Sequence, residues 1–468
     1  MKGAADTYQG RGLIADPIHQ YILYTRPGGI PGESTEQDLI DTSWVQRLRR
    51  VPQLQSARWV YPSAEHSRFQ HSLGAMHLAG RLAQQLYPSL HAVFPDAPSP
   101  ALVEELLRVA GLLHDVGHGP FGHFFDDNFL VDYDLTHELV GQRIIREELA
   151  DILRSLRRSP GGAFTAGETI DPEWICYLMG KAYTQPLESH PRWLPFLKPL
   201  LSGVFTADNM DYVLRDSYMC GVAVGPIDIE RIIYYVFFSE KGLTLDRGGL
   251  QEFTMFLNAR FYMYTNVYYH RTTRGIDLHL KEIFRDTMRI AFPYDLRKEL
   301  HPYLHLTEWT LLEDVGKWHD ADDPERKRLG GEWRHVLDRK LKWRMSHEVI
   351  LDLFEPKRGH SFLKAEDVED RVRMFLPRGI RAFPFKIDMA LQDPRPLNPL
   401  KMGDRQIYVY DSSTKRVSEE PLTEILKYLP GKVAQCRIFA ESHEHDAELA
   451  VALERALGEE PPSIATNV

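Results

Sequence analysis

Apolar residues recur at helical spacing through most of the first 290 residues. The clearest case is the segment 99–116, where one helical face carries Leu102, Leu106, Val109 and Leu113. The same spacing predicts helices over about 36–51, 72–86, 136–156, 171–184, 205–218 and 249–280. Thr136 is the expected N-cap of its helix, and Asp41 or Thr42 can cap a turn in the first one.

Alternating apolar and polar residues predict short strands near both ends of the chain. Residues 12–26 are typical of a strand pair, and 232–249 of a hairpin that turns at 240–242. Beyond about residue 381, strands are expected in RAFPFKIDMAL, RQIYVYDSS and VAQCRIFAES, before a last helix in HDAELAVALERAL. The pattern therefore predicts a mainly α fold with short β-hairpins over 1–290, a charged helical extension over 291–380 and a small α+β region over 381–468.

The composition is ordinary for a soluble globular protein, with 43% hydrophobic and 26% charged residues. A length of 468 residues predicts more than one domain. The N-terminal residues lack the apolar region of a signal peptide, and no apolar run has the roughly 18 residues of a membrane span. The three cysteines form no CxxC pair, which disfavours a thiolate metal site. We therefore expect a cytoplasmic protein that does not enter a membrane.

The formal charge of −10 disfavours general attraction to nucleic acid. A basic stripe over 326–344 can still bind an anion locally, although such a stripe is more often a solvated helix face. A nucleic-acid-binding scaffold with a vestigial site is therefore a disfavoured alternative. A phosphate ligand would need a pocket in which metal and arginine reverse the sign of the charge.

The stretch GLLHDVGHGPFGHFFD, residues 111–126, indicates a metal site. His114 and Asp115 end an apolar helix, and His118 and His123 follow in a glycine-rich turn. An adjacent imidazole and carboxylate are costly to bury unless something binds them, and a divalent cation does so. This donor set suits Mn, Fe, Co, Ni or Zn, while carboxylate also suits Mg.

Further ligands must come from other segments. His71, in HSRFQHSLG, is the best second histidine, and Asp208, in ADNMDYVLRDS, is the best second carboxylate. Spacing alone does not exclude Asp211, although Asp211 and Arg215 also have the spacing of an ordinary i, i+4 ion pair. An isolated His-Asp pair often arises by chance, so the combination of segments is what favours a metal.

These segments resemble the HD-domain phosphohydrolases, in the branch of the deoxynucleoside triphosphate triphosphohydrolases. The resemblance covers somewhat over half the chain, through DPIHQYI, DTSWVQRLRRVPQL, YPSAEHSRFQHSLG, GLLHDVGHGPFGHFFD, THE, DNMDYVLRDSYMCGV and ARFYMYTNVYYHR. It implies a divalent metal cofactor, a nucleotide substrate and hydrolysis to deoxynucleoside and tripolyphosphate.

The resemblance also implies roles for individual residues. The family's metal ligands match His71, His114, Asp115 and Asp208. Its catalytic residues match His118, His123 and His137, with Asp126 in place to orient His137. Its nucleotide contacts match Gln53, Leu54, Arg68, Tyr212, Asp216, Arg260 and Tyr268. Arg260, Tyr264 and Tyr268 are expected on one helical face, where Tyr268 would exclude a 2′-hydroxyl, although most of this aromatic run is expected to be core.

Two features bear on substrate and regulation. Asn209 replaces a lysine of the animal members, so a phosphate-binding charge is missing, and a nucleotidase or phosphodiesterase is the alternative activity. Asp41, Gln46 and Arg49 match positions that bind an activating guanine nucleotide in the animal members, although Asp41 can also cap a helix and Arg49 can pair locally. The resemblance further implies a homo-oligomer, either a dimer or a tetramer.

Overall fold

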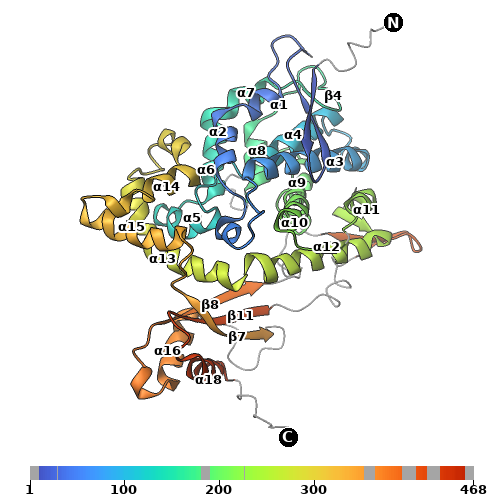
Figure 1. Ribbon diagram of the computed structural model, residues 1–468. Helices are drawn as coiled ribbons and strands as arrows, with labels where there is room; N and C mark the ends of the chain where they lie inside the picture. The colour runs from blue at the N-terminus through green and yellow to red at the C-terminus, as the bar shows by residue number, and fades with distance from the viewer. Residues whose placement is uncertain are drawn as a thin grey trace. The chain divides into compact units, whose positions relative to one another are not determined.

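The computed structural model describes residues 10–28, 30–180, 190–225, 227–352, 364–392, 407–418 and 433–458. Its internal contacts divide the chain into two compact units, which can be followed by residue number in Figure 1. The first unit comprises 1–259, 292–312 and 396–427, and the second comprises 260–291, 313–395 and 428–468. The division of the chain at residues 290 and 380 stays a prediction.

The first unit is mainly helical and carries two small sheets in addition to a pairing of the two-residue strands β3 (Arg158–Ser159) and β4 (Gly162–Ala163). Its helices are α1 (Glu36–Ile40), α2 (Ser43–Arg47), α3 (Arg68–Val93), α4 (Pro100–Leu113), α5 (His123–Asn128), α6 (His137–Ile144), α7 (Ala150–Ser155), α8 (Pro172–Met179), α9 (Leu194–Leu197), α10 (Ala207–Cys220), α11 (Ile229–Tyr235) and most of α12 (Leu250–Met263). One sheet pairs β1 (Arg11–Asp16) with antiparallel β2 (Gln20–Thr25). The other has the order β10-β9-β6-β5, from β5 (Val236–Ser239), β6 (Gly242–Asp246), β9 (Tyr408–Asp411) and β10 (Arg416–Val417).

The helices that carry the site begin at polar caps. Ser99 caps α4 by accepting a hydrogen bond from the amide of Leu102, and Thr136 caps α6 as predicted. α3 begins with a capping box between Ser67 and Gln70 and is longer than the predicted 72–86. α3 and α4 pack closely, since a Cβ on Gly111 would lie 2.9 Å from the carbonyl oxygen of Ala75. This close packing brings the first turns of α3 beside the end of α4.

The second unit contains an antiparallel sheet of order β7-β11-β8, with helices α16 (Ala365–Phe375) and α18 (Asp446–Ala456). The strands are β7 (Arg344–Asp352), β8 (Phe385–Gln392) and β11 (Val433–Ala440), drawn in orange to red in Figure 1. Its core includes Leu351, Val368, Val372, Cys436, Ile438, Leu449 and Leu453. The unit also contains α13 (Arg271–Ala291) and α15 (Pro324–Leu337), and α14 (Glu308–Val315) begins in the first unit.

The prediction of helix throughout 293–380 was wrong for β7. Val349 and Leu351 are buried while Ile350 is 62% exposed, which is the two-residue alternation of a strand. Basic residues of the stripe over 326–344 form ion pairs, including one between Arg328 and Asp286 and one between Arg334 and Asp338. These pairs are what a solvated helix face would show.

The fold class is mainly α with short β elements, as predicted. The predicted helix over 249–280 is divided, because a π-turn over Tyr264–Tyr268 separates α12 from α13. The predicted helix over 171–184 ends at Met179, and residues 181–184 lie outside the described residues. Among the described helices, none is long and apolar enough to cross a membrane.

Candidate metal centre

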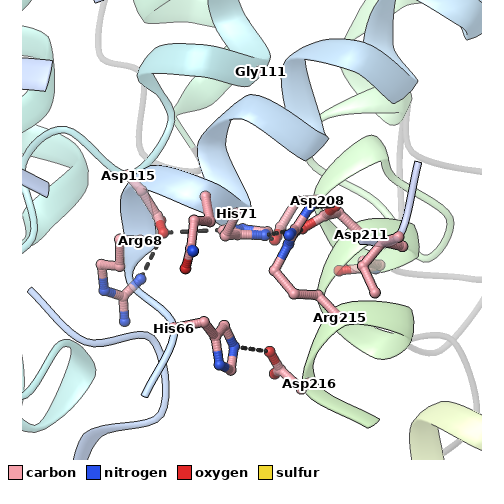
Figure 2. Close-up of polar contacts among 12 residues, drawn as sticks. His66, Arg68, His71, Gly111, Asp115, Asp208, Asp211, Arg215 and Asp216 are labelled. Atoms are coloured by element: carbon pink, nitrogen blue, oxygen red, sulfur yellow. Dashed lines mark hydrogen bonds and ion pairs between the residues drawn. The ribbon is translucent and has the colours of Figure 1, made fainter. Parts of the chain in front are cut away.

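The structure brings His71, His114 and Asp115 into one group whose ligand-type atoms lie within 4.8 Å of one another, and it places Asp208 beside the two histidines. His71 lies in the first turn of α3, His114 directly follows α4, and Asp208 lies in the first turn of α10. The two imidazole Nε2 atoms are 3.1 Å apart, and Asp208 Oδ1 lies 3.1 Å from that of His71 and 3.7 Å from that of His114. Asp115 Oδ1 lies 3.3 Å from His114 Nε2. Figure 2 shows His71 between the carboxylates of Asp115 and Asp208.

The outer nitrogen of each imidazole is already hydrogen-bonded. His71 Nδ1 lies 2.7 Å from a carboxylate oxygen of Asp211, and His114 Nδ1 lies 2.7 Å from the carbonyl oxygen of Gly111. Both partners accept hydrogen bonds, so each Nδ1 carries a proton and each Nε2 faces the other proposed ligands. The two Nε2 atoms and two carboxylates lie so close together that they need a proton or a cation between them.

Asp211 fixes His71 through the ring nitrogen that faces away from the other proposed ligands. Its carboxylate receives hydrogen bonds from Arg215 at 2.9 Å and lies 2.7 Å from His19 Nε2. The predicted i, i+4 ion pair between Asp211 and Arg215 is therefore present. Because Asp211 contacts the Nδ1 side of His71, Asp208 is the carboxylate that faces Nε2. This geometry separates the two aspartates, which spacing could not do.

The charges of the site favour a bound cation. Burial lowers the pKa of His71, but hydrogen bonds to Asp208 and Asp211 outweigh burial and raise it to about 10. Burial raises the pKa of Asp208, but hydrogen bonds to His114 and His71 hold it below its usual range. The pocket thus stabilises positive charge between these groups. A divalent cation fits the donor set, because imidazole nitrogen and carboxylate oxygen are the ligands such ions take.

A second group of histidines lies beside the first. His118, His123, Asp126 and His137 each offer a ligand-type atom within 4.8 Å of the others. The rings of His118 and His137 stack with centroids 3.7 Å apart, and His137 Nδ1 hydrogen-bonds to the Asp126 carboxylate. His118 Nε2 lies 3.3 Å from Asp115 Oδ1, which links the two groups. The predicted contact of Asp126 with His137 is present.

These histidines differ in exposure. The side chain of His118 is 1% exposed, whereas that of His123 is 64% exposed. Burial, together with the charge of Arg68, holds the pKa of His118 well below its usual range. His118 is therefore neutral at pH 7, while His123 lies open to solvent at the start of α5.

Several predicted nucleotide contacts line the same region. Arg68 is buried and donates to Asp115 Oδ2 at 2.6 Å (Figure 2). Gly122, at φ +54°, leaves room for the Arg68 guanidinium that a Cβ there would meet. Leu54 is buried, and the side-chain oxygen of Gln53 is buried without a hydrogen-bond partner among the described residues. Such a buried oxygen is what a polar ligand would satisfy.

Asp216 lies on α10 with Tyr212 and forms a buried pair with His66, whose Nε2 is 2.8 Å from Asp216 Oδ1. His66 was missed by sequence reasoning, although it stands in the same HSRFQHSLG segment as His71. Arg47, which donates to the carbonyl oxygen of His118, and Glu308, which accepts from the amide of Phe121, were missed as well. Only packing between distant segments reveals these three contacts.

Arg260 and Tyr268 belong to the second unit, so their roles toward the site stay predictions. The π-turn over Tyr264–Tyr268 alters the α-helical phase on which the shared face with Arg260 was based. Within the turn, the rings of Tyr264 and Tyr268 contact each other with centroids 5.0 Å apart.

The positions matched to an activating nucleotide have local partners. Asp41 is the C-cap of α1, and Gln46 donates to the carbonyl oxygen of Ile40. Arg49 donates to Gln46 at 2.7 Å and stacks on Phe69 with its guanidinium carbon 3.7 Å from the ring centroid. Asp41 and Arg49 therefore have the local roles considered from the sequence, and Gln46 also has a local partner.

Comparison with known protein families finds matches over two parts of the chain. The HD domain matches residues 68–180, which include His71 and the His114-Asp115 pair. The HD associated region matches residues 227–291. The chain therefore contains a match to the HD domain followed by a match to the HD associated region.

The chain is similar to several known proteins. It is 29% identical to the deoxynucleoside triphosphate triphosphohydrolase SAMHD1 of Homo sapiens, over 90% of this chain and 69% of that protein. It is 40% identical to SAMHD1 of Bos taurus over 58% of this chain and 47% of that protein. It is also 29% identical to the uncharacterized protein YwfO of Bacillus subtilis, over 66% of this chain and 67% of that protein. These matches thus span about half to two-thirds of the relatives' length.

A solved structure shares the fold. The crystal structure of a hypothetical protein from Aquifex aeolicus superposes with a TM-score of 0.68 and 25% identity, over 95% of this chain and all of that one.

Proposed function

We propose that the protein hydrolyses deoxynucleoside triphosphates to deoxynucleoside and tripolyphosphate, with a divalent metal held by His71, His114, Asp115 and Asp208. The observation that carries this proposal is the approach of the two Nε2 atoms to 3.1 Å, with each ring fixed by a hydrogen bond at its other nitrogen. When bound, the metal polarises a phosphate oxygen and activates water. Mn, Mg, Fe, Co, Ni and Zn all suit this role.

The neighbouring side chains supply phosphate binding and proton transfer. Arg68 presents a forked donor that can bind a phosphate oxygen once a cation competes for Asp115. Asp126 fixes the Nδ1 proton of His137, so His137 Nε2 can accept or donate a proton. His118 or His123 can activate water or protonate the leaving oxygen. Gln53, Leu54, Tyr212 and Asp216 form the proposed nucleoside side of the pocket.

The named activities of two relatives support the choice of substrate. The human and bovine proteins are named deoxynucleoside triphosphate triphosphohydrolases. We extend that activity to this chain because its proposed ligands and histidine cluster come from the segments that resemble this branch. The resemblance also assigns nucleotide binding to Arg260 and Tyr268, with Tyr268 selecting against a 2′-hydroxyl.

Asn209 favours a second candidate, a nucleotidase or phosphodiesterase with the same metal site. Its side-chain amide donates to the carbonyl oxygen of Val204 at 3.0 Å, and the residue is 6% exposed. Asn209 therefore supplies no positive charge to a long phosphate chain. A shorter phosphate group would not need that charge.

Product analysis distinguishes the candidates. The purified full chain is incubated with Mn²⁺ and each dNTP, rNTP and dNMP, and the products are separated by chromatography. Deoxynucleoside and tripolyphosphate are expected from dNTPs, and Asp208→Asn should abolish turnover. Asp151→Asn is the control, because the Asp151 side chain is fully exposed. Cleavage of a monophosphate with no cleavage of any dNTP would refute the proposal and favour the second candidate.

We also propose that the protein is cytoplasmic and forms a homo-oligomer, either a dimer or a tetramer. We further propose that a guanine nucleotide activates it by binding to Asp41, Gln46 and Arg49. Mass measurement in solution with and without dGTP tests assembly, and rates with and without dGTP test activation. Equal rates would remove the activator from the proposal.

A further inference from the structure

A short segment far along the chain contacts the loop over 114–122, which connects α4 to α5 and carries His118. This segment, residues 301–308, begins with a 3-10 turn over His301–His305 and ends at the first residue of α14. It lies outside both the HD domain and the HD associated region. It nevertheless belongs to the first unit, while the flanking stretches 260–291 and 313–395 belong to the second.

Three side chains connect this segment to consecutive parts of the loop. The Tyr303 hydroxyl donates to the carbonyl oxygen of Gly117 at 2.8 Å. Arg47 donates to the carbonyl oxygen of His118 at 2.7 Å. Glu308 accepts from the amide of Phe121 at 3.0 Å. The loop backbone is thus fixed at Gly117, at His118 and at Phe121, two residues before His123.

Arg47 joins the loop to the segment in a buried position. The guanidinium donates to the carbonyl oxygens of Tyr303 at 3.0 Å and Leu306 at 2.7 Å, in addition to that of His118. It also lies 4.3 Å from the centroid of the Tyr303 ring. Arg47, Tyr303 and Glu308 are all 0% exposed. Burial of a guanidinium and a carboxyl group is costly, so a purely packing role would be better served by apolar residues.

The loop needs such support because its backbone is strained. Phe121 has φ +63°, a left-handed conformation that is unfavourable for a bulky side chain. Gly122 follows at φ +54°. The Glu308 carboxylate holds the amide of Phe121 itself. Release of this contact would let the loop relax and change the directions of His118 and His123.

We propose that Arg47, Tyr303 and Glu308 are positioning residues that fix His118 and His123 for the reaction. This inference rests on the proposed function, in which those histidines transfer protons. The three residues act through the backbone of the loop and need not touch the substrate.

Tyr303→Phe is the sharpest test, because it removes only the hydroxyl that binds Gly117. We expect kcat to fall by roughly 3- to 10-fold, as for the loss of one hydrogen bond, at unchanged KM and metal content. Tyr294→Phe is the matched control, since Tyr294 is 41% exposed. Tyr303→Phe is also combined with His118→Ala. A positioning role predicts little further loss of kcat in that background, whereas an equal loss in both backgrounds overturns it.

Hydrogen exchange provides a readout that does not depend on turnover. The amides of 117–123 should exchange faster in Tyr303→Phe and in Glu308→Gln than in the unaltered chain, while those of α4 keep their protection. If no nucleotide is hydrolysed by the unaltered chain, the proposed function fails. The exchange measurement still tests whether the three residues fix the loop. Unchanged exchange of 117–123 in both variants overturns the inference, as does unchanged kcat.

Discussion

His71 and Asp211 are joined by a 2.7 Å contact between Nδ1 and a carboxylate oxygen, and this contact decides which way the imidazole faces. With Nδ1 bonded to Asp211, the ring turns Nε2 toward His114 and Asp208. Asp211 is itself fixed by Arg215 and His19. The metal site therefore depends on a carboxylate that is not a proposed ligand.

Asp211→Asn should weaken metal binding by roughly 10- to 100-fold, the usual effect of altering the partner of a ligating histidine. The amide can still accept from His71, but it lacks the charge that stabilises the ring and balances Arg215. Competition with a fluorescent chelator measures the affinity for Mn²⁺. Asp151→Asn is the exposed control and should bind as the unaltered chain does. Equal affinity in Asp211→Asn would show that Asp211 does not support the site.

Metal binding should strengthen as pH rises. The pKa of His71 without metal is raised to about 10, so at neutral pH a proton must leave before Nε2 can bind a cation. The apparent Kd should fall up to about tenfold per pH unit until other groups titrate. Calorimetry in buffers of different ionisation enthalpy should show release of about one proton per metal at pH 7. Release of no proton would contradict this assignment.

The same shift predicts the stability of the metal-free protein. Because the folded pKa of His71 lies above the unfolded value of about 6.5, protonated His71 stabilises the fold fully below that pH. This contribution is lost as pH rises from about 6.5 through 10. Denaturant midpoints of chelator-treated protein should therefore decline over this interval, and His71→Gln should remove that decline.

The sequence predicted the ligand segments better than the links between them. His114 and Asp115 stood at the end of an apolar helix, which made their burial visible from the pattern of Leu106 and Leu113. The contact of Asp211 with His71 joins α10 to α3, 140 residues apart, and no local pattern encodes it. The choice between Asp208 and Asp211 therefore came from resemblance, and geometry separates them only once the helices are packed.

Local periodicity likewise misjudged segments where the pattern changes within a few residues. The charged stretch up to Lys342 favoured helix, which hid the alternation of β7. The regular spacing from Arg260 to Tyr268 suggested one face, but a π-turn inserts an extra residue into the repeat. Tyr303 and Glu308 carry no motif, so their contacts with the loop could be found only in three dimensions.

Glu105 should make stability fall as pH rises. It is 0% exposed, and neither carboxylate oxygen has a hydrogen-bond partner among the described residues. Burial, and then the charge of Glu36, raises the pKa of Glu105 well above its usual range. Above about pH 4.5 the unfolded chain ionises at this position while the fold keeps the proton, so stability is lost up to the folded pKa. Glu105→Gln should therefore gain about 1–3 kcal/mol over the unaltered chain at pH 8 and little at pH 4.5.

Replacing two helical glycines by alanine should distinguish an effect on metal binding from an effect on helix stability alone. A Cβ on Gly74 would overlap the Asp211 carboxylate and the Arg215 guanidinium. Gly74→Ala should therefore displace Asp211 from His71, weaken Mn²⁺ binding at least tenfold and cost about 1–3 kcal/mol. Gly331→Ala is the matched control, because nothing lies within 4 Å of its added Cβ in α15 and alanine favours helix by up to about 1 kcal/mol. Thermal unfolding and chelator competition measure both effects. Tight metal binding by Gly74→Ala would show that the approach of α3 to α10 does not set the orientation of His71.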